Sequence, residues 1–167
     1  ALLYTGQCYF YQEKYLKALD QFEALLKMEG AESIKDKVLF WLGEVYSRGR
    51  DYKQAAEFYK QLTNNYKTSS YYLAAYKSLA LAKMNDAKLQ EAQDTYRFIY
   101  VQFKDESVVE EALFGICETF YRMRNYADLK KELSVFVAKY PNSKLLGRAY
   151  FYLGEANFYL EFYDEAI

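Results

Sequence analysis

The stretch "WLGEVYSRGRDYKQAAEFY" at residues 41–59 returns in closely similar form as "YLGEANFYLEFYDEA" at residues 152–166. The glycines of the two copies, Gly43 and Gly154, lie 111 residues apart, which is three steps of 37. A glycine inside a helix costs about 1 kcal/mol relative to alanine, so a recurring glycine indicates a packing requirement. A fixed period of this size is typical of repeat architectures, and we therefore expect an array of repeats.

Other positions keep the same 37-residue step without any insertion. The glycine position holds only small residues, which are Gly6, Gly43, Ala80, Cys117 and Gly154. A second position holds Tyr15, Tyr52, Leu89, Tyr126 and Tyr163, and a third holds Phe22, Tyr59, Tyr96 and Leu133. These positions predict a single array over residues 1–167, with repeats at about 1–32, 33–69, 70–106, 107–143 and an incomplete 144–167. Because the chain starts and stops inside expected helices, we expect the array to continue in both directions.

Each repeat is expected to contain two helices joined by a short polar break. Apolar residues recur at helical spacing at Val38, Leu39, Leu42, Val45 and Tyr46, and the polar stretch "SRGRD" (47–51) follows them. Asp51 is expected to cap the next helix. Ser33 with Asp36, and Ser107 with Glu110, resemble capping boxes that would start first helices. No alternation typical of strands competes, so the predicted fold class is all-α.

The small residue in the first helix, the aromatic that opens the second, and the alanine and aromatic four residues apart resemble the tetratricopeptide repeat. The segment "LFWLGEVYSRGRDYKQAAEFYKQL" (39–62) carries the pattern most fully. The resemblance implies a right-handed α-solenoid of about four and a half repeats whose first helices line the concave side. The 37-residue step and the linker "YPNS" (140–143) are also similar to bacterial periplasmic repeat proteins associated with the Tol–Pal system and to outer-membrane assembly lipoproteins. That narrower resemblance implies a periplasmic or cell-envelope location.

Composition argues against several classes of protein. The formal net charge is −1 and the basic residues are scattered, so we expect neither nucleic acid nor a membrane surface as partner. No apolar run is long enough to span a membrane. The chain has no His and only two Cys, Cys8 and Cys117, which we expect to be reduced core thiols. We predict no catalytic residue, no metal site and no cofactor, and hence no enzyme, because the commonest general base is missing and no phosphate-binding glycine motif occurs.

Tyrosine is abundant, with 20 residues, and most of it is expected to serve the architecture. A large amphipathic ring at a repeated helical position fills the space between helices and keeps its hydroxyl near water. We expect this packing role at Tyr9, Tyr15, Tyr46, Tyr52, Tyr59, Tyr96 and Tyr126.

A second set of residues flanks these core positions on the first helices and would point into a concave groove. The predicted groove residues are Phe10, Phe40, Glu44, Arg48, Lys77, Met84, Phe114, Glu118, Tyr121, Arg122, Phe151, Glu155, Phe158 and Tyr159. If they face inward, the groove is an aromatic trough with a ladder of carboxylates, which suits a ligand with apolar side chains and some Lys or Arg. The alternative is that these rings complete the packing between repeats.

The leading functional hypothesis is a non-enzymatic scaffold that binds a peptide or a segment of another protein in this groove. The alternative is a structural module that forms homo-oligomers by stacking its repeats. A cell-envelope carrier that contacts glycan through its aromatic residues is a third hypothesis.

Overall fold

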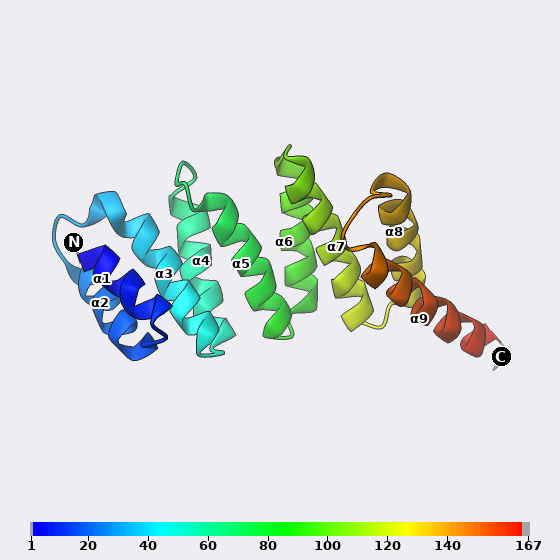
Figure 1. Ribbon diagram of the computed structural model, residues 1–167, viewed down its shortest axis with the longest axis horizontal. Helices are drawn as coiled ribbons and strands as arrows, with labels where there is room; N and C mark the ends of the chain where they lie inside the picture. Colours follow the sequence, from blue (N-terminus) through cyan, green and yellow to red (C-terminus); the bar gives the residue numbers. More distant parts are fainter. Residues whose placement is uncertain (1, 165–167) are drawn as a thin grey trace. The chain divides into compact units, whose positions relative to one another are not determined.

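The computed structural model describes the backbone of residues 2–164 and the side chains of residues 2–161, so the side chain of Tyr163 and the two chain ends lie outside it. The described residues form nine α-helices, one 3₁₀-helix and no strand (Figure 1). In chain order they are α1 (Leu2–Tyr11), α2 (Tyr15–Lys27), η1 (Glu32–Ile34), α3 (Lys35–Arg48), α4 (Tyr52–Asn65), α5 (Tyr72–Asn85), α6 (Leu89–Gln102), α7 (Glu106–Arg122), α8 (Tyr126–Lys139) and α9 (Leu146–Asp164). The all-α prediction is confirmed.

The chain divides into two compact units, an N-terminal unit of residues 1–88 and a C-terminal unit of residues 89–167. Within the N-terminal unit, consecutive helices from α1 to α5 pack against one another. Within the C-terminal unit, α6 packs on α7, α7 on α8, and α8 on α9. The boundary falls inside the third expected repeat, after the first of its two helices.

The recurring small residue provides room for an aromatic ring. A Cβ atom added at Gly43 would lie 2.4 Å from Cε1 of Tyr59, and one added at Gly6 would lie 2.5 Å from Cε1 of Phe22. In both repeats the glycine is on the first helix and the ring is on the second, 16 residues later. The packing requirement that the recurring glycine indicated is therefore confirmed for Gly6 and Gly43, which contact the second helices of their repeats.

The turns between paired helices repeat with the same period. Within the described residues, four that are not glycine have a positive φ, namely Glu13 at 58°, Arg50 at 61°, Ala87 at 58° and Arg124 at 57°. They lie 37 residues apart, and each is in the turn that follows a first helix. This left-handed conformation is unfavourable for residues with a Cβ atom. Its recurrence shows that the tight turn itself, and not a particular side chain, is the repeated feature.

Of the three helix caps predicted from the sequence, one is present in the structure and two are not. Asp51 caps α4, with its Oδ1 accepting from the N–H of Gln54 at 3.0 Å. The predicted capping box at Ser107 is wrong, because Asp105 caps α7 and accepts from the N–H of Val108. The box at Ser33 is also wrong, since α3 begins after Ile34 with no side-chain cap.

The acidic residues assigned to those boxes have another role. The hydroxyl of Ser69 donates to Asp36 at 2.5 Å, and the hydroxyl of Ser143 donates to Glu110. Each serine oxygen also accepts a backbone N–H two residues later, from Tyr71 and Leu145 respectively. The N-terminal part of a first helix is thus tied to the linker that leads into the next repeat.

The tyrosines predicted as packing residues fall into two groups. Tyr59 and Tyr96 are buried, whereas the other five are half-buried, as expected for rings that keep a hydroxyl near water. Of the two cysteines, Cys117 is a buried free thiol, but Cys8 is exposed, so its assignment to the core is wrong. The reason is that Cys8 lies on the side of α1 turned away from the buried Gly6 and Phe10.

Candidate functional site

The fourteen predicted groove residues do not share one environment. Phe10, Met84 and Phe114 are buried and are therefore corrections to the predicted groove. The ring of Phe10 lies 5.2 Å from that of Trp41, and the ring of Phe114 lies 5.3 Å from that of Phe136. For these residues the alternative reading holds, because their side chains complete the packing between helices.

In the N-terminal unit, a pocket lies between α3 and α5. It is lined by Glu44, Ser47, Arg48, Tyr52, Ser78, Leu81 and Asn85. Leu81 is half exposed at 51 %, and Arg48 is exposed while its guanidinium lies 5.7 Å from the Phe10 ring. Two predicted groove residues, Glu44 and Arg48, are thus together in this pocket.

The carboxylate of Glu44 is held by neutral donors. It accepts from the Tyr59 hydroxyl at 2.7 Å and from the Ser78 hydroxyl at 3.1 Å. Burial, and then the negative charge of Glu44, raises the pKa of Tyr59 well above the usual value for a tyrosine. Neither of these two donors is a cation, but the cationic side chain of Arg48 lines the same pocket.

Two further predicted residues of this unit lie beside the pocket. Phe40 is half-buried, with its ring centroid 4.7 Å from that of Tyr71 and 6.0 Å from that of Tyr59. Lys77 is half-buried on α5. Phe40 therefore contributes mainly to packing.

In the C-terminal unit, Arg148 joins α9 to α7. Its guanidinium forms an ion pair with Glu118 and lies 4.9 Å from the ring centroid of Phe114 and 5.9 Å from that of Tyr152. The carboxylate of Glu118 is thus already matched by a cation of the chain. One member of the predicted carboxylate ladder is less available to a basic ligand than the sequence suggested.

Tyr121 and Glu155 form a second link between α7 and α9. The Tyr121 ring stacks on Tyr152, with centroids 4.2 Å apart. Its hydrogen bond with Glu155, and then burial, raises the pKa of Tyr121 to about 12. The other oxygen of this carboxylate, Oε2 of Glu155, is buried and has no hydrogen-bond partner among the described residues.

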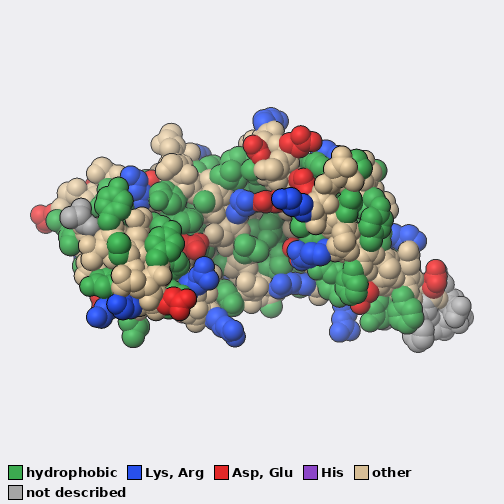
Figure 2. All heavy atoms as spheres, viewed as in Figure 1, with side chains coloured by type: hydrophobic (Ala, Val, Ile, Leu, Met, Phe, Trp, Pro, Cys, Tyr) green, Lys and Arg blue, Asp and Glu red, His purple; other side chains and the backbone are tan. Residues whose placement is uncertain are grey.

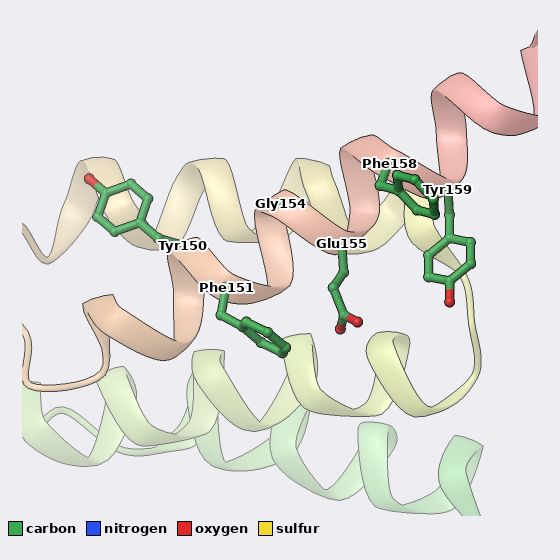
Figure 3. Close-up of a pocket in the computed structure, with 6 residues that line it drawn as sticks. All are labelled: Tyr150, Phe151, Gly154, Glu155, Phe158 and Tyr159. Carbon is green, nitrogen blue, oxygen red and sulfur yellow. The ribbon is translucent and has the colours of Figure 1, made fainter.

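Several exposed aromatic side chains lie on α9. Phe151 is 60 % exposed, Phe158 64 % and Tyr150 57 %, and Figure 2 shows hydrophobic side chains at the surface over this helix, at the right of the view. Together with Gly154, Glu155 and Tyr159 they line an open pocket. Figure 3 shows Phe151, Glu155 and Tyr159 pointing to the same side of α9, while Tyr150 points elsewhere. We call this set of six residues the α9 pocket.

The remaining predicted residues flank this surface. The Tyr159 ring stacks on that of Tyr126, with centroids 4.5 Å apart and planes inclined by 12°. Arg122 is exposed at the end of α7. The structure therefore brings Tyr121, Glu155 and Tyr159 into one region of the C-terminal unit, next to Phe151 and Phe158.

Sequence reasoning did not identify Tyr150, Arg148, Tyr152 or Ser78. The 37-residue step could have identified Tyr150, because Tyr150 lies at the same repeat position as Leu39, a residue of the predicted apolar face of a first helix. Arg148 and Tyr152 are four residues apart on one helix face, which is a recognisable pair. Their meeting with Glu118 depends on the packing of α9 on α7, which spacing alone does not define.

The chemistry of these surfaces is that of binding. Among the described residues, no group of three or more His, Cys, Asp or Glu side chains could hold a metal ion. In the part of the chain that the structure covers, no helix combines the length and the apolar character needed to cross a membrane. The thiol of Cys117 is buried, which raises its pKa to about 12 and leaves it protonated at neutral pH.

Comparisons with known proteins agree with this architecture. Residues 1–28 and 37–69 match the family model of the tetratricopeptide repeat. No curated protein matches the chain in sequence. The matches do not extend to the narrower periplasmic group.

Three solved structures show the same fold. A tetratricopeptide repeat protein from Parabacteroides merdae superposes with a TM-score of 0.78 at 13 % identity, over 96 % of this chain and 60 % of that one. The apo form of RapI superposes with a TM-score of 0.76 at 13 % identity, over 99 % of this chain and 65 % of that one. The nearly identical tetratricopeptide-like repeats of a Podospora anserina kinesin light chain superpose with a TM-score of 0.69 at 17 % identity, over 96 % of this chain and 90 % of that one. The chain thus spans less than two thirds of the length of the first two relatives. Two stretches of the chain, residues 1–28 and 37–69, thus match the tetratricopeptide repeat, and the solved structures share its helical repeat fold.

Proposed function

We propose that the first helices of this scaffold bind a segment of another protein that carries apolar and basic side chains. The observation that supports this most directly is the α9 pocket, where Phe151 and Phe158 are mostly exposed beside the carboxylate of Glu155. Large exposed apolar surfaces usually mark binding sites, and aromatic side chains are the commonest anchors of interfaces. No Lys or Arg is among the residues that line this pocket.

The electrostatics of the pocket favour a basic partner. Glu155 receives a hydrogen bond from the neutral phenol of Tyr121, and the described residues that line the pocket include no Lys or Arg that could offset its charge. A Lys or Arg of a bound segment would meet this charge in a partly desolvated site, where electrostatic attraction is stronger than at an open surface. An acidic segment would be repelled.

The pocket between α3 and α5 is proposed as a second contact surface of the same kind. It combines the carboxylate of Glu44, which is held by the hydroxyls of Tyr59 and Ser78, with the half-exposed side chain of Leu81. Its polar serines and Asn85 suit the backbone of an extended segment. Each unit therefore has a binding surface of its own.

Peptide selection tests this proposal. Random peptides displayed on phage would be selected on the immobilised chain, and the dissociation constants of the enriched peptides would be measured by isothermal titration calorimetry. We expect enrichment of aromatic or aliphatic residues together with Lys or Arg. Because hot-spot truncations cost about 2 kcal/mol or more, Phe158→Ala should weaken binding at least about tenfold.

The control substitution is Leu16→Ala, which removes an apolar side chain that is 79 % exposed on α2, far from the α9 pocket in the sequence. It should leave the dissociation constants unchanged within about twofold, as expected for a surface residue outside the interface. Enrichment of acidic peptides, or equal losses for the two variants, would contradict the proposal.

Self-assembly is the second candidate function, and the same exposed aromatic surface favours it. It requires that the molar mass measured by light scattering rises with protein concentration and returns to the monomer value in Phe151→Ala. A constant monomer mass would exclude it and leave the binding proposal in place. The cell-envelope location depends only on the resemblance of the "YPNS" linker and stays a prediction.

A further inference from the structure

The pocket between α3 and α5, which we call the α3–α5 pocket, lies within the second and third repeats. It is lined by Glu44, Ser47, Arg48, Tyr52, Ser78, Leu81 and Asn85. Helices precede and follow these repeats in the chain, α1 and α2 on one side and α6 to α9 on the other. The open surface of this pocket therefore does not come from a repeat that lacks a neighbour in the sequence.

Four of the lining residues occupy two positions of the 37-residue repeat. Glu44 on α3 corresponds to Leu81 on α5, and Arg48 corresponds to Asn85 in the same way. Side chains four residues apart lie on the same face of a helix. Thus α3 contributes a carboxylate and, one turn later, a guanidinium, while α5 contributes the 51 % exposed Leu81 and the exposed Asn85.

The carboxylate of Glu44 is fixed in place but only half satisfied. Both of its donors, the hydroxyls of Tyr59 at 2.7 Å and Ser78 at 3.1 Å, bond to the same oxygen, Oε1. The other oxygen, Oε2, has no donor among the described residues and is not enclosed by them. A cation of a ligand could therefore bind Oε2 without displacing either hydroxyl.

The guanidinium of Arg48 is held away from this carboxylate. It lies 5.7 Å from the centroid of the Phe10 ring on α1, and among the described residues it forms no ion pair. A Glu and an Arg four residues apart commonly pair on a helix surface. Here Glu44 is bonded towards α4 and α5 and Arg48 packs towards α1, so both charges stay open to a ligand.

We propose that the α3–α5 pocket binds an extended segment of another protein in which a Lys or Arg lies two residues from an Asp or Glu. The basic side chain would bind Glu44 and the acidic one Arg48. Four residues of a helix rise by about 6 Å, and side chains two residues apart on an extended segment point the same way with a spacing of about 6.6 Å. The inference rests on the proposed function and deepens it by adding the acidic residue and its spacing.

The other lining residues suit the same occupant. The aliphatic part of a Lys or Arg bound to Glu44 would cover the exposed Leu81. Ser47 and Asn85 offer hydrogen bonds to a backbone, which is free in an extended segment and already satisfied in a helix. A segment with basic residues alone would place a like charge beside Arg48, and one with acidic residues alone would do so beside Glu44.

Parallel phage selections on three immobilised chains test the charge pattern. They use the unsubstituted chain, Arg48→Glu and, as the matched control, Arg50→Glu, which changes the same charge two residues away and outside the pocket. The control position accepts a glutamate, because Glu13 occupies it in the first repeat with a φ of 58° against 61° for Arg50. On the unsubstituted and control chains we expect one enriched family of peptides with a basic and an acidic residue two apart. On Arg48→Glu a second Lys or Arg should replace the acidic residue.

Affinities measure the same effect on one enriched peptide, synthesised with blocked ends and a fluorescent label and titrated by fluorescence anisotropy. Arg48→Glu should weaken its binding at least about tenfold, because an attractive charge pair becomes a repulsive one. Arg50→Glu should leave it unchanged within about twofold. Since Arg48 also covers the ring of Phe10, the second variant is Arg48→Gln, which keeps a long polar side chain. It should weaken binding about fivefold, and have no effect on a peptide whose acidic residue is replaced by its amide.

The inference is overturned if Arg48→Glu and Arg50→Glu select the same peptides, or if the enriched peptides carry their two charges four residues apart, as a helix would. A dimer that is lost in Arg48→Glu would also overturn it, since a second copy would then be the occupant. The proposed function is judged separately. Peptides with apolar and basic residues that lose affinity with Phe158→Ala but not with Arg48→Glu would support that function and reject this inference, and the absence of any enriched peptide would contradict both.

Discussion

The substitution Gly43→Ala tests the feature on which the repeat depends. The added methyl group would lie 2.4 Å from Cε1, 2.7 Å from Cζ and 2.8 Å from Cδ1 of Tyr59, distances at which the ring or the helix must move. The ring has little freedom to move, because it is 1 % exposed and its hydroxyl is held by Glu44. We therefore expect the packing of α4 on α3 to be disturbed over the whole contact.

The expected cost follows from two opposing effects. Overpacking a core costs about 1–3 kcal/mol, and the upper end applies to a ring held at both its edge and its hydroxyl. Alanine favours the helix over glycine by about 1 kcal/mol. The net expectation is a fall of about 2 kcal/mol in the free energy of unfolding, which at a urea m value of about 1 kcal/mol/M lowers the midpoint by about 2 M.

Urea titration followed by Trp41 fluorescence provides the assay, because Trp41 is the only tryptophan and is buried in the N-terminal unit. Gly49→Ala is the matched control in the same unit. Gly49 has a φ of −72°, and its nearest contact for a Cβ atom is an ordinary 3.5 Å, so its substitution should be neutral or slightly stabilising. A Gly43→Ala variant as stable as the Gly49→Ala control would refute the reasoning.

A double variant refines the test. The fourth repeat combines Cys117 with Leu133 at these two positions, a larger residue with a smaller partner, and both side chains are fully buried. The double variant Gly43→Ala with Tyr59→Leu should therefore lose less free energy of unfolding than the two single variants lose together, because the effects of substitutions at contacting residues are not additive. Additive losses would mean that the methyl group and the ring do not compete for the same space.

Three further outcomes follow from the burial of single side chains. The pKa of Tyr59 is raised, mainly by burial, so the stabilising contribution of its neutral phenol is complete below the usual tyrosine pKa of about 10 and is lost as the pH rises above it. Between about pH 8 and pH 11 the urea midpoint of Tyr59→Phe should therefore fall less than that of the unsubstituted protein. A thiol reagent should modify the exposed Cys8 in the folded protein and Cys117 only in urea; modification of both at equal rates would contradict the buried position of Cys117. Phe114→Ala should lower the free energy of unfolding by about 3–5 kcal/mol, since this ring is 2 % exposed, whereas Phe158→Ala should change it by no more than about 0.5 kcal/mol, as measured by circular dichroism in urea.

The sequence was informative wherever a contact recurs. The 37-residue step identified Gly43, and the structure places the ring of Tyr59 on it. Asp51 was recognisable as a cap because capping is a local event within three residues. The serines at 33 and 107 failed as caps for the opposite reason, since Asp36 and Glu110 bind the hydroxyls of Ser69 and Ser143 from the following linker. A local motif cannot report a partner that lies 33 residues away.

The groove prediction met the same limit. Helical spacing placed Phe10, Phe114 and Phe158 on equivalent sides of their helices, yet the first two are buried and the third is 64 % exposed. The difference comes from their neighbours, because Trp41 covers Phe10, while Phe136 and Arg148 cover Phe114. Residues on the same side of corresponding helices share a direction but not a neighbour.

The sequence by itself determined the helical class, the length of the repeat and the recurrence of a small residue in each first helix, because these depend on periodicity and side-chain volume. Only the tertiary structure decided which of the repeated positions are covered and which are open. Gly43 and Gly154 occupy the same position of the repeat, but a ring lies against the first and nothing lies within 4 Å of the second. Exposure is a property of the helices packed around a residue, and for this reason the α9 pocket emerged from the fold and not from the pattern.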